Sequence, residues 1–197
     1  AGGSFGTSTA AVSTGGYDGT NYVQTTIEYN GSSWSSGGSM NRPAGQSFNG
    51  LGTESSGGIA GGYKTSGNAV VNNFESYNGS AWTTNNNMGI NHAGQHFCAG
   101  TVTDAIVGAG GAPYALAATS ETYDGTSFTA GGNLSTARSV LSGSPNGTQT
   151  ASYATAGIAV PGFSAETKKK GGPASPPFAQ EGAVSGRRRP PGFPPER

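Results

Sequence analysis

The chain has 197 residues, 36 of them glycine, and only 10% are charged, which argues against one large core of packed leucine and isoleucine. Its length fits one domain or one short repeat array. The formal net charge is zero, but residues 1–165 carry seven acids and three bases, whereas residues 166–197 carry three acids and seven bases. The mildly acidic body lacks the basic surface typical of nucleic-acid-binding domains, so only the basic tail is a candidate for nucleic-acid contact.

From the N-terminus, three units of about 47 residues follow one another. Each begins with a run of small or apolar residues that leads into a glycine pair: Gly15 and Gly16, Gly61 and Gly62, Gly110 and Gly111. A tyrosine follows, and an aromatic residue comes five positions after it: Tyr29 and Trp34, Tyr77 and Trp82, Tyr123 and Phe128. Six positions further lies a large apolar residue, and then a basic or imidazole residue: Arg42, His92 and Arg138.

The local sequence of each unit favours short strands. Asn-Gly or Asp-Gly directly after the tyrosine is typical of a β-hairpin, because both central residues of a type I′ turn need positive φ. Residues 26–29 and 73–77 alternate in polarity, and no long stripe of helical period occurs. We expect about four strands in each unit. Such a unit cannot bury both faces alone, so it should stack on its neighbours.

The end of the array repeats its beginning. Residues 147–151 resemble residues 6–10, and both lead to a pair of small residues, Ala156–Gly157 and Gly15–Gly16. The pattern is lost after Gly157, so we predict a repeat array over residues 1–160. Residues 161–197 contain Lys168–Lys170, Arg187–Arg189 and most of the prolines, which predicts a disordered or polyproline tail or linker. A solubilising tail is the alternative.

The order of apolar strand, Gly-Gly, acid with tyrosine, turn, aromatic and basic residue resembles the kelch repeat. This resemblance implies an all-β fold of kelch-like four-stranded blades in a partial or oligomer-completed β-propeller, because three units are fewer than the roughly four to eight blades of a closed ring. A stacked β fibre is the alternative. The Ser-, Thr-, Asn- and Gly-rich sequence of the repeats also resembles kelch-like arrays in phage and marine-virus tail or fibre proteins.

The resemblance assigns roles to the repeated residues. The glycine pairs would allow close backbone approach near the ring centre. Each tyrosine and its aromatic partner would pack between adjacent blades. The basic positions would lie near the channel mouth and bind a glycan or an acidic peptide, with stacking surfaces from the tyrosines after each glycine pair: Tyr17, Tyr63 and Tyr114. The alternative is that the basic residues are solvated or brace loops.

The search for catalytic chemistry predicts none. His92 and His96 have the spacing of metal ligands on a helix, but on the predicted strand they would lie about 13 Å apart. One acid recurs in each unit, at Glu28, Glu75 and Glu121, and these acids should satisfy backbone or tyrosine groups within each blade. We expect no catalytic residue, metal or cofactor.

Together these patterns predict a non-enzymatic structural or adhesive module of a virion surface, tail or fibre, or of the extracellular space. Its partners would be copies of itself, other virion proteins, and a surface glycan or acidic peptide. The alternative is a kelch-type protein–protein interaction domain of a cellular adaptor. No run of about 18 apolar residues occurs, so we expect no membrane span.

Overall fold

The computed structural model describes residues 2–42, 49–62, 70–92, 95–111, 115–159, 162–163 and 167–170. All the regular secondary structure in these ranges consists of β-strands. None of the described residues forms a helix that could cross a membrane. The first sheet contains β1 (Gly3–Gly6), β2 (Ala11–Thr14), β3 (Thr26–Tyr29) and β4 (Trp34–Ser36). The second contains β5 (Asn49–Thr53), β6 (Ser56–Ala60), β7 (Phe74–Tyr77) and β8 (Trp82–Thr84). The third contains β9 (Phe97–Thr101), β10 (Asp104–Gly108), β11 (Ser120–Tyr123) and β12 (Phe128–Ala130).

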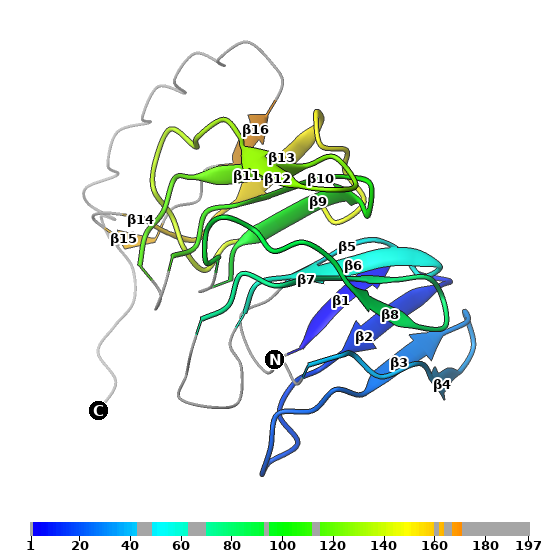
Figure 1. Ribbon diagram of the computed structural model, residues 1–197. Helices are drawn as coiled ribbons and strands as arrows, with labels where there is room; N and C mark the ends of the chain where they lie inside the picture. Colours follow the sequence, from blue (N-terminus) through cyan, green and yellow to red (C-terminus); the bar gives the residue numbers. More distant parts are fainter. Residues whose placement is uncertain are drawn as a thin grey trace, which may run out of the picture.

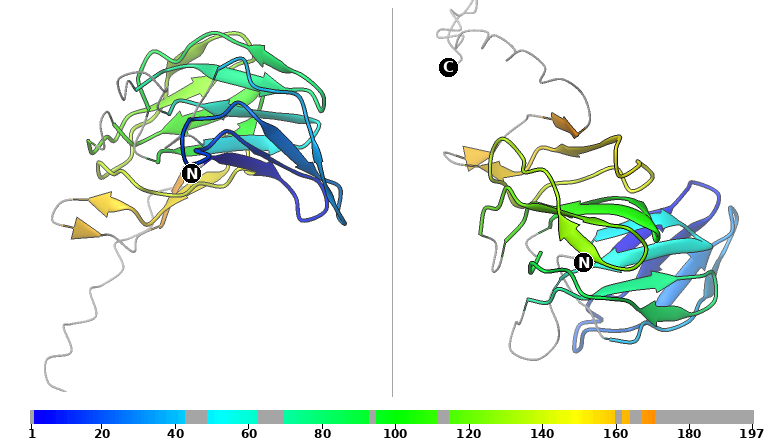
Figure 2. Two further views of the ribbon diagram at one scale, coloured as in Figure 1. Left: turned by 90° about the horizontal axis from the view of Figure 1, so that it is seen from below. Right: turned by 45° about the horizontal axis from the view of Figure 1, so that its top comes forward.

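The three sheets are antiparallel meanders, in which each strand pairs with the strand that follows it in sequence. Figure 1 shows them following one another as blades, and the first strands lie side by side, β1 against β5 and β5 against β9. The blades form a fan and not a closed ring, as the two views of Figure 2 also show. The predicted all-β class and four-stranded units of a partial propeller are confirmed.

The hairpin between the third and fourth strands has the same form in each sheet. In the first sheet four residues separate the paired Tyr29 and Trp34, and the side-chain oxygen of Asn30 accepts a hydrogen bond of 3.0 Å from the amide of Ser33. Gly31 has a φ of 95°, which glycine adopts without strain, but Asn30 does not have positive φ. The predicted hairpins are confirmed, but the turn is not the two-residue type I′ form.

A fourth unit continues the array beyond the predicted boundary. Its strands are β13 (Ser152–Thr155), β14 (Ile158–Ala159), β15 (Gly162–Phe163) and β16 (Thr167–Lys170). β13 pairs with β16 in the register that β2 makes with β3: Ser152 opposes Lys170 as Ala11 opposes Tyr29, a shift of 141 residues at both positions. β15 and β16 lie beyond residue 160, where the repeat array was predicted to end. Residues 171–197 lie outside the described part of the chain.

The core is divided into clusters that lie between successive units. The first contains residues of units one and two: Phe5, Val12, Met40, Ile59, Tyr77 and Trp82. The second joins units two and three: Leu51, Ala60, Phe74, Met88, Cys98, Ala105, Val107 and Tyr123. The third joins units three and four: Phe97, Ala99, Ile106, Ala109, Leu141 and Ala154. Several small cores thus replace one large core, as the composition predicted.

The predicted tyrosine–aromatic pairs form, but within one sheet and not between two. Tyr77 and Trp82 are cross-strand neighbours on β7 and β8, with ring centroids 4.8 Å apart. The pair then packs on the preceding unit, where the ring of Trp82 meets Phe5 edge-on at 6.1 Å. In the third unit, Tyr123 packs on the second unit in the same way, with its ring centroid 5.0 Å from that of Phe74. Each pair is therefore half of an interface between units.

Pairs of residues with positive φ end the second strand of every unit. They are Gly15 and Gly16, Gly61 and Gly62, Ala109 and Gly110, and Ala156 and Gly157. The third pair was predicted at Gly110 and Gly111, but in the structure it begins one residue earlier. Ala109 adopts a φ of 60°, a value that is uncommon for residues other than glycine. A Cβ atom on Gly61 would clash with the carbonyl oxygen of His92, so the backbone passes close to the linker that follows the unit. The predicted close approach is thus to a linker.

Candidate functional site

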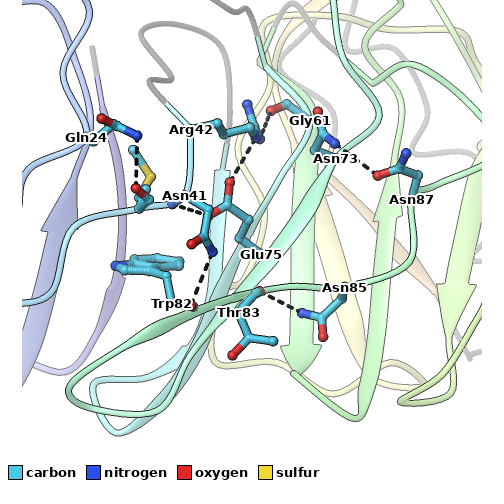
Figure 3. Close-up of polar contacts among 11 residues, drawn as sticks. Gln24, Asn41, Arg42, Gly61, Asn73, Glu75, Trp82, Thr83, Asn85 and Asn87 are labelled. Carbon is cyan, nitrogen blue, oxygen red and sulfur yellow. Dashed lines mark hydrogen bonds and ion pairs between the residues drawn. The ribbon is translucent and has the colours of Figure 1, made fainter.

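The most regular polar feature of the protein is a brace between each linker and the next unit. Arg42 lies in the linker between β4 and β5, and its Nη2 donates to the carbonyl oxygen of Gly61 at 2.9 Å. Its Nε lies 3.1 Å from Oε1 of Glu75 on β7, forming an ion pair (Figure 3). The other carboxylate oxygen of Glu75 accepts a hydrogen bond of 2.9 Å from the amide of Asn41. The linker is thus attached to the unit that follows it.

The same brace recurs one unit later with histidine in place of arginine. Nδ1 of His92 lies 2.8 Å from the carbonyl oxygen of Ala109, and its Nε2 lies 3.2 Å from Oε2 of Glu121 on β11. Glu121 also accepts hydrogen bonds from the amides of Gly89 and Ile90. A carbonyl oxygen only accepts, so Nδ1 of His92 carries a hydrogen. His92 thus contacts both the backbone and the glutamate of the third unit.

Arg138 makes the corresponding contact with the fourth unit. Its Nη1 donates to the carbonyl oxygen of Ala156 at 3.0 Å, and the side chain is buried. Ala156 has the positive φ of Gly61 and Ala109, so all three basic residues reach the same backbone position of the next unit. The register places Lys168 where the second and third units have glutamate.

Burial shapes the charges of the Arg42–Glu75 brace. Removal from water raises the pKa of Glu75, and the amide of Asn41 and the guanidinium of Arg42 oppose that rise. Burial likewise lowers the pKa of Arg42, and the carboxylate of Glu75 opposes this change. Arginine remains protonated in proteins, so the guanidinium keeps its charge and a buried carboxylate beside it is the stabilising partner.

These positions bear on the predicted ligand-binding residues. Arg42, His92 and Arg138 contact the protein itself and have little or no exposed surface, which fits the alternative interpretation that they brace loops. Their role in ligand binding stays a prediction without structural support. Tyr63 and Tyr114 lie outside the described residues.

Tyr17 is exposed, and its ring meets that of Tyr22 edge-on at 5.4 Å. The two tyrosines pair across the loop between β2 and β3, where Oδ1 of Asp18 accepts hydrogen bonds from the amides of Thr20 and Asn21 at 2.8 and 2.7 Å. These amide hydrogen bonds lower the pKa of Asp18, so its carboxylate is ionised at neutral pH and fixes the loop. The loop therefore presents an aromatic ring to solvent on a defined backbone.

Glu28 does not share the position of the other acids. Glu75 and Glu121 precede their tyrosines by two residues, whereas Glu28 precedes Tyr29 by one. Ile27 stands in the equivalent position, and Glu28 points to the opposite face of its sheet, where it accepts a hydrogen bond from the hydroxyl of Tyr77. The predicted one-acid repeat within each blade was therefore wrong in the first unit, and counting back from the tyrosine would have revealed it.

The described residues contain no group of three or more His, Cys, Asp or Glu side chains that could hold a metal ion. His92 and His96 have ring centroids 5.9 Å apart, closer than predicted, because His92 lies in the linker before β9 and not on a strand. Cys98 is buried, which raises the pKa of its thiol and keeps it protonated and unreactive. No protein-family model matches this chain, and no curated protein matches it.

Proposed function

We propose that the chain is a non-enzymatic structural and adhesive module of kelch-like blades, displayed on the surface of a particle such as a virion tail or fibre. The observation that carries this proposal is the use of the repeated charges. Glu75 with Arg42 and Glu121 with His92 hold successive units together inside the protein. The repeated chemistry therefore serves assembly of the array, and the turns that face solvent contain small polar residues such as Asn30 and Ser32.

The adhesive part of the proposal rests on the loop of Tyr17. A tyrosine ring offers a large, rigid contact surface with few rotatable bonds, which suits stacking on the apolar face of a sugar. Tyr22 and the hydrogen bonds of Asp18 support the ring of Tyr17 from behind. A preorganised surface loses little conformational entropy on binding. A glycan is thus the ligand class that this loop fits best.

The alternative function, a cellular adaptor domain that binds an acidic peptide through Arg42, His92 and Arg138, has less support. An acidic peptide would have to reach these side chains from solvent, but they are enclosed between units. It would also have to replace Glu75 as the partner of Arg42 and Glu121 as the partner of His92. Breaking a buried ion pair is costly, so such exchange is disfavoured.

A glycan array tests the adhesive proposal. We expect the intact chain to bind a defined set of glycans without releasing any sugar, and Tyr17→Ala to lose this binding. Ile90→Ala is the matched control, because Ile90 is also an exposed apolar side chain but lies in the linker before β9. Binding that survives Tyr17→Ala, hydrolysis of a bound glycan, or no binding to any glycan on the array would contradict the proposal.

A further inference from the structure

The sheet of the first unit has one face that no other described unit covers. Each sheet has an upstream face, which packs on the preceding unit, and a downstream face, which receives the following unit. On the upstream face of the first sheet lie Ile27, Tyr29 and Trp34, and we call these three residues the first-unit face. Trp34 is 54% exposed and Ile27 43%, whereas Trp82, the equivalent of Trp34 in the second unit, is only 7% exposed.

The equivalent residues in the second unit show what this face is built to contact. Trp82 packs edge-on against Phe5 of the preceding unit, and its Nε1 donates to Oγ1 of Thr26 at 2.9 Å. The hydroxyl of Tyr77 donates to the carboxylate of Glu28, also in the preceding unit. The tyrosine–tryptophan pair is thus the chain's own surface for meeting a downstream face. In the first unit the pair is complete, with ring centroids 5.1 Å apart.

Ile27 indicates which kind of unit covers the first-unit face. In the second and third units this position is Glu75 or Glu121, and its carboxylate holds the amides and the basic residue of the incoming linker. Isoleucine has no acceptor for such a linker. The unit that meets the first-unit face therefore arrives without the linker contacts that join successive units, and the face is correspondingly more apolar.

The fourth unit has an exposed aromatic side chain on its downstream side, which the described residues leave uncovered. Tyr153 occupies the register position of Val12, which is fully buried beneath the second unit, yet Tyr153 is 48% exposed. We infer that the first-unit face binds the downstream face of the fourth unit of a second copy of this chain. Two copies related by a twofold axis would then form this interface twice, once at the first unit of each copy.

This inference deepens the proposed structural role by naming its partner and surface, and it does not depend on glycan binding. Sedimentation velocity of the full chain, which has a monomer mass of 19.5 kDa, tests it. We expect a dimer at micromolar concentration. Ile27→Glu and Tyr153→Lys should each weaken dimerisation at least about tenfold, since each places a charge in the interface. Ile90→Lys is the matched control, because it adds a charge at an exposed apolar side chain of the linker before β9, and it should leave the dimer intact.

Mixing the two variants distinguishes this head-to-tail interface from others. In a mixed dimer one interface carries both substitutions and the other carries neither, so the mixture should associate more tightly than either variant alone. Thermal melts of the monomeric variants check that they remain folded. A monomeric parent chain, a dimer that resists Ile27→Glu, or a mixture that stays as weak as its components would overturn the inference. A dimer without glycan binding would contradict only the adhesive proposal.

Discussion

At the scale of the residue, Tyr77 shows how one side chain joins two units. Its ring lies on Trp82 of its own sheet, and its hydroxyl donates to Glu28 of the preceding sheet. Burial, and then the hydrogen bond to the carboxylate of Glu28, raise the pKa of Tyr77 from 10.0 to about 12. The phenol is thus neutral in the folded protein over a pH range in which it ionises in the unfolded chain.

The raised pKa of Tyr77 predicts a specific loss of stability in alkali. Below pH 10 the phenol is protonated in both states, so its stabilising contribution is fully present. As the pH rises from 10 to about 12, the unfolded chain releases this proton first, and the free energy of unfolding falls. Urea titrations between pH 8 and 12 should show a steeper fall for the parent than for Tyr77→Phe. Parallel curves for the two proteins would refute this account of Tyr77.

At the scale of the element, backbone and side-chain hydrogen bonds attach the linkers to the sheets. The amide of Met40 donates to the carbonyl oxygen of Gln24 at 2.9 Å, and the amide of Met88 donates to that of Asn72 at 2.8 Å. The side-chain amides of Gln24 and Asn72 return hydrogen bonds to the carbonyl oxygens of the two methionines. The acid–base braces then fix the end of each linker. A blade therefore includes its linker as a structural part.

The brace of Arg42 predicts a large effect of a small change. Glu75→Gln keeps an acceptor for the amide of Asn41 but leaves the guanidinium of Arg42 enclosed without its counter-charge. We expect a loss of about 3 kcal/mol in the free energy of unfolding, measured by urea denaturation. The double variant Arg42→Met with Glu75→Gln removes both charges and should be more stable than Glu75→Gln alone. Equal stability of the parent and Glu75→Gln would show that the brace does not support the linker.

Most strands could be predicted from the sequence, because each unit repeats the same turn residues at the same spacing. β16 could not be predicted in this way, because its sequence, Thr167–Lys170, lacks the tyrosine and the alternation of β3. Only its pairing with β13 reveals the repeat. Tertiary pairing thus overrides a local sequence that is typical of a basic tail.

The candidate site was predicted less well than the fold. The sequence identified Arg42, His92 and Arg138 as one repeated position, and the structure gives them one repeated contact with the next unit. Whether such a residue faces solvent or the next unit depends on how the units stack, which a single sequence does not reveal. The exposed loop of Tyr17 was named from its place after a glycine pair, but its support by Tyr22 needed coordinates.

At the scale of the whole molecule, one loop ties the last described unit to the others. Nδ2 of Asn146 donates to the carbonyl oxygen of Gly6 at 2.9 Å, and the carbonyl oxygen of Pro145 accepts from the amide of Gly52 at 3.1 Å. The side chain of Gln149 donates to two carbonyl oxygens of the third unit. The fourth unit therefore contacts all three preceding units.

The central claim is that units stack through their tyrosine–aromatic faces, so that Trp82 is covered within one chain and Trp34 is not. These are the two tryptophans of the protein, and phenylalanine already occupies their position in the third unit at Phe128. Acrylamide quenching of Trp34→Phe and Trp82→Phe therefore reports on one face at a time. The account predicts that Trp82 is protected at every protein concentration, and that Trp34 is readily quenched in dilute solution. Equal quenching of the two tryptophans, or a Trp82 more accessible than Trp34, would contradict it.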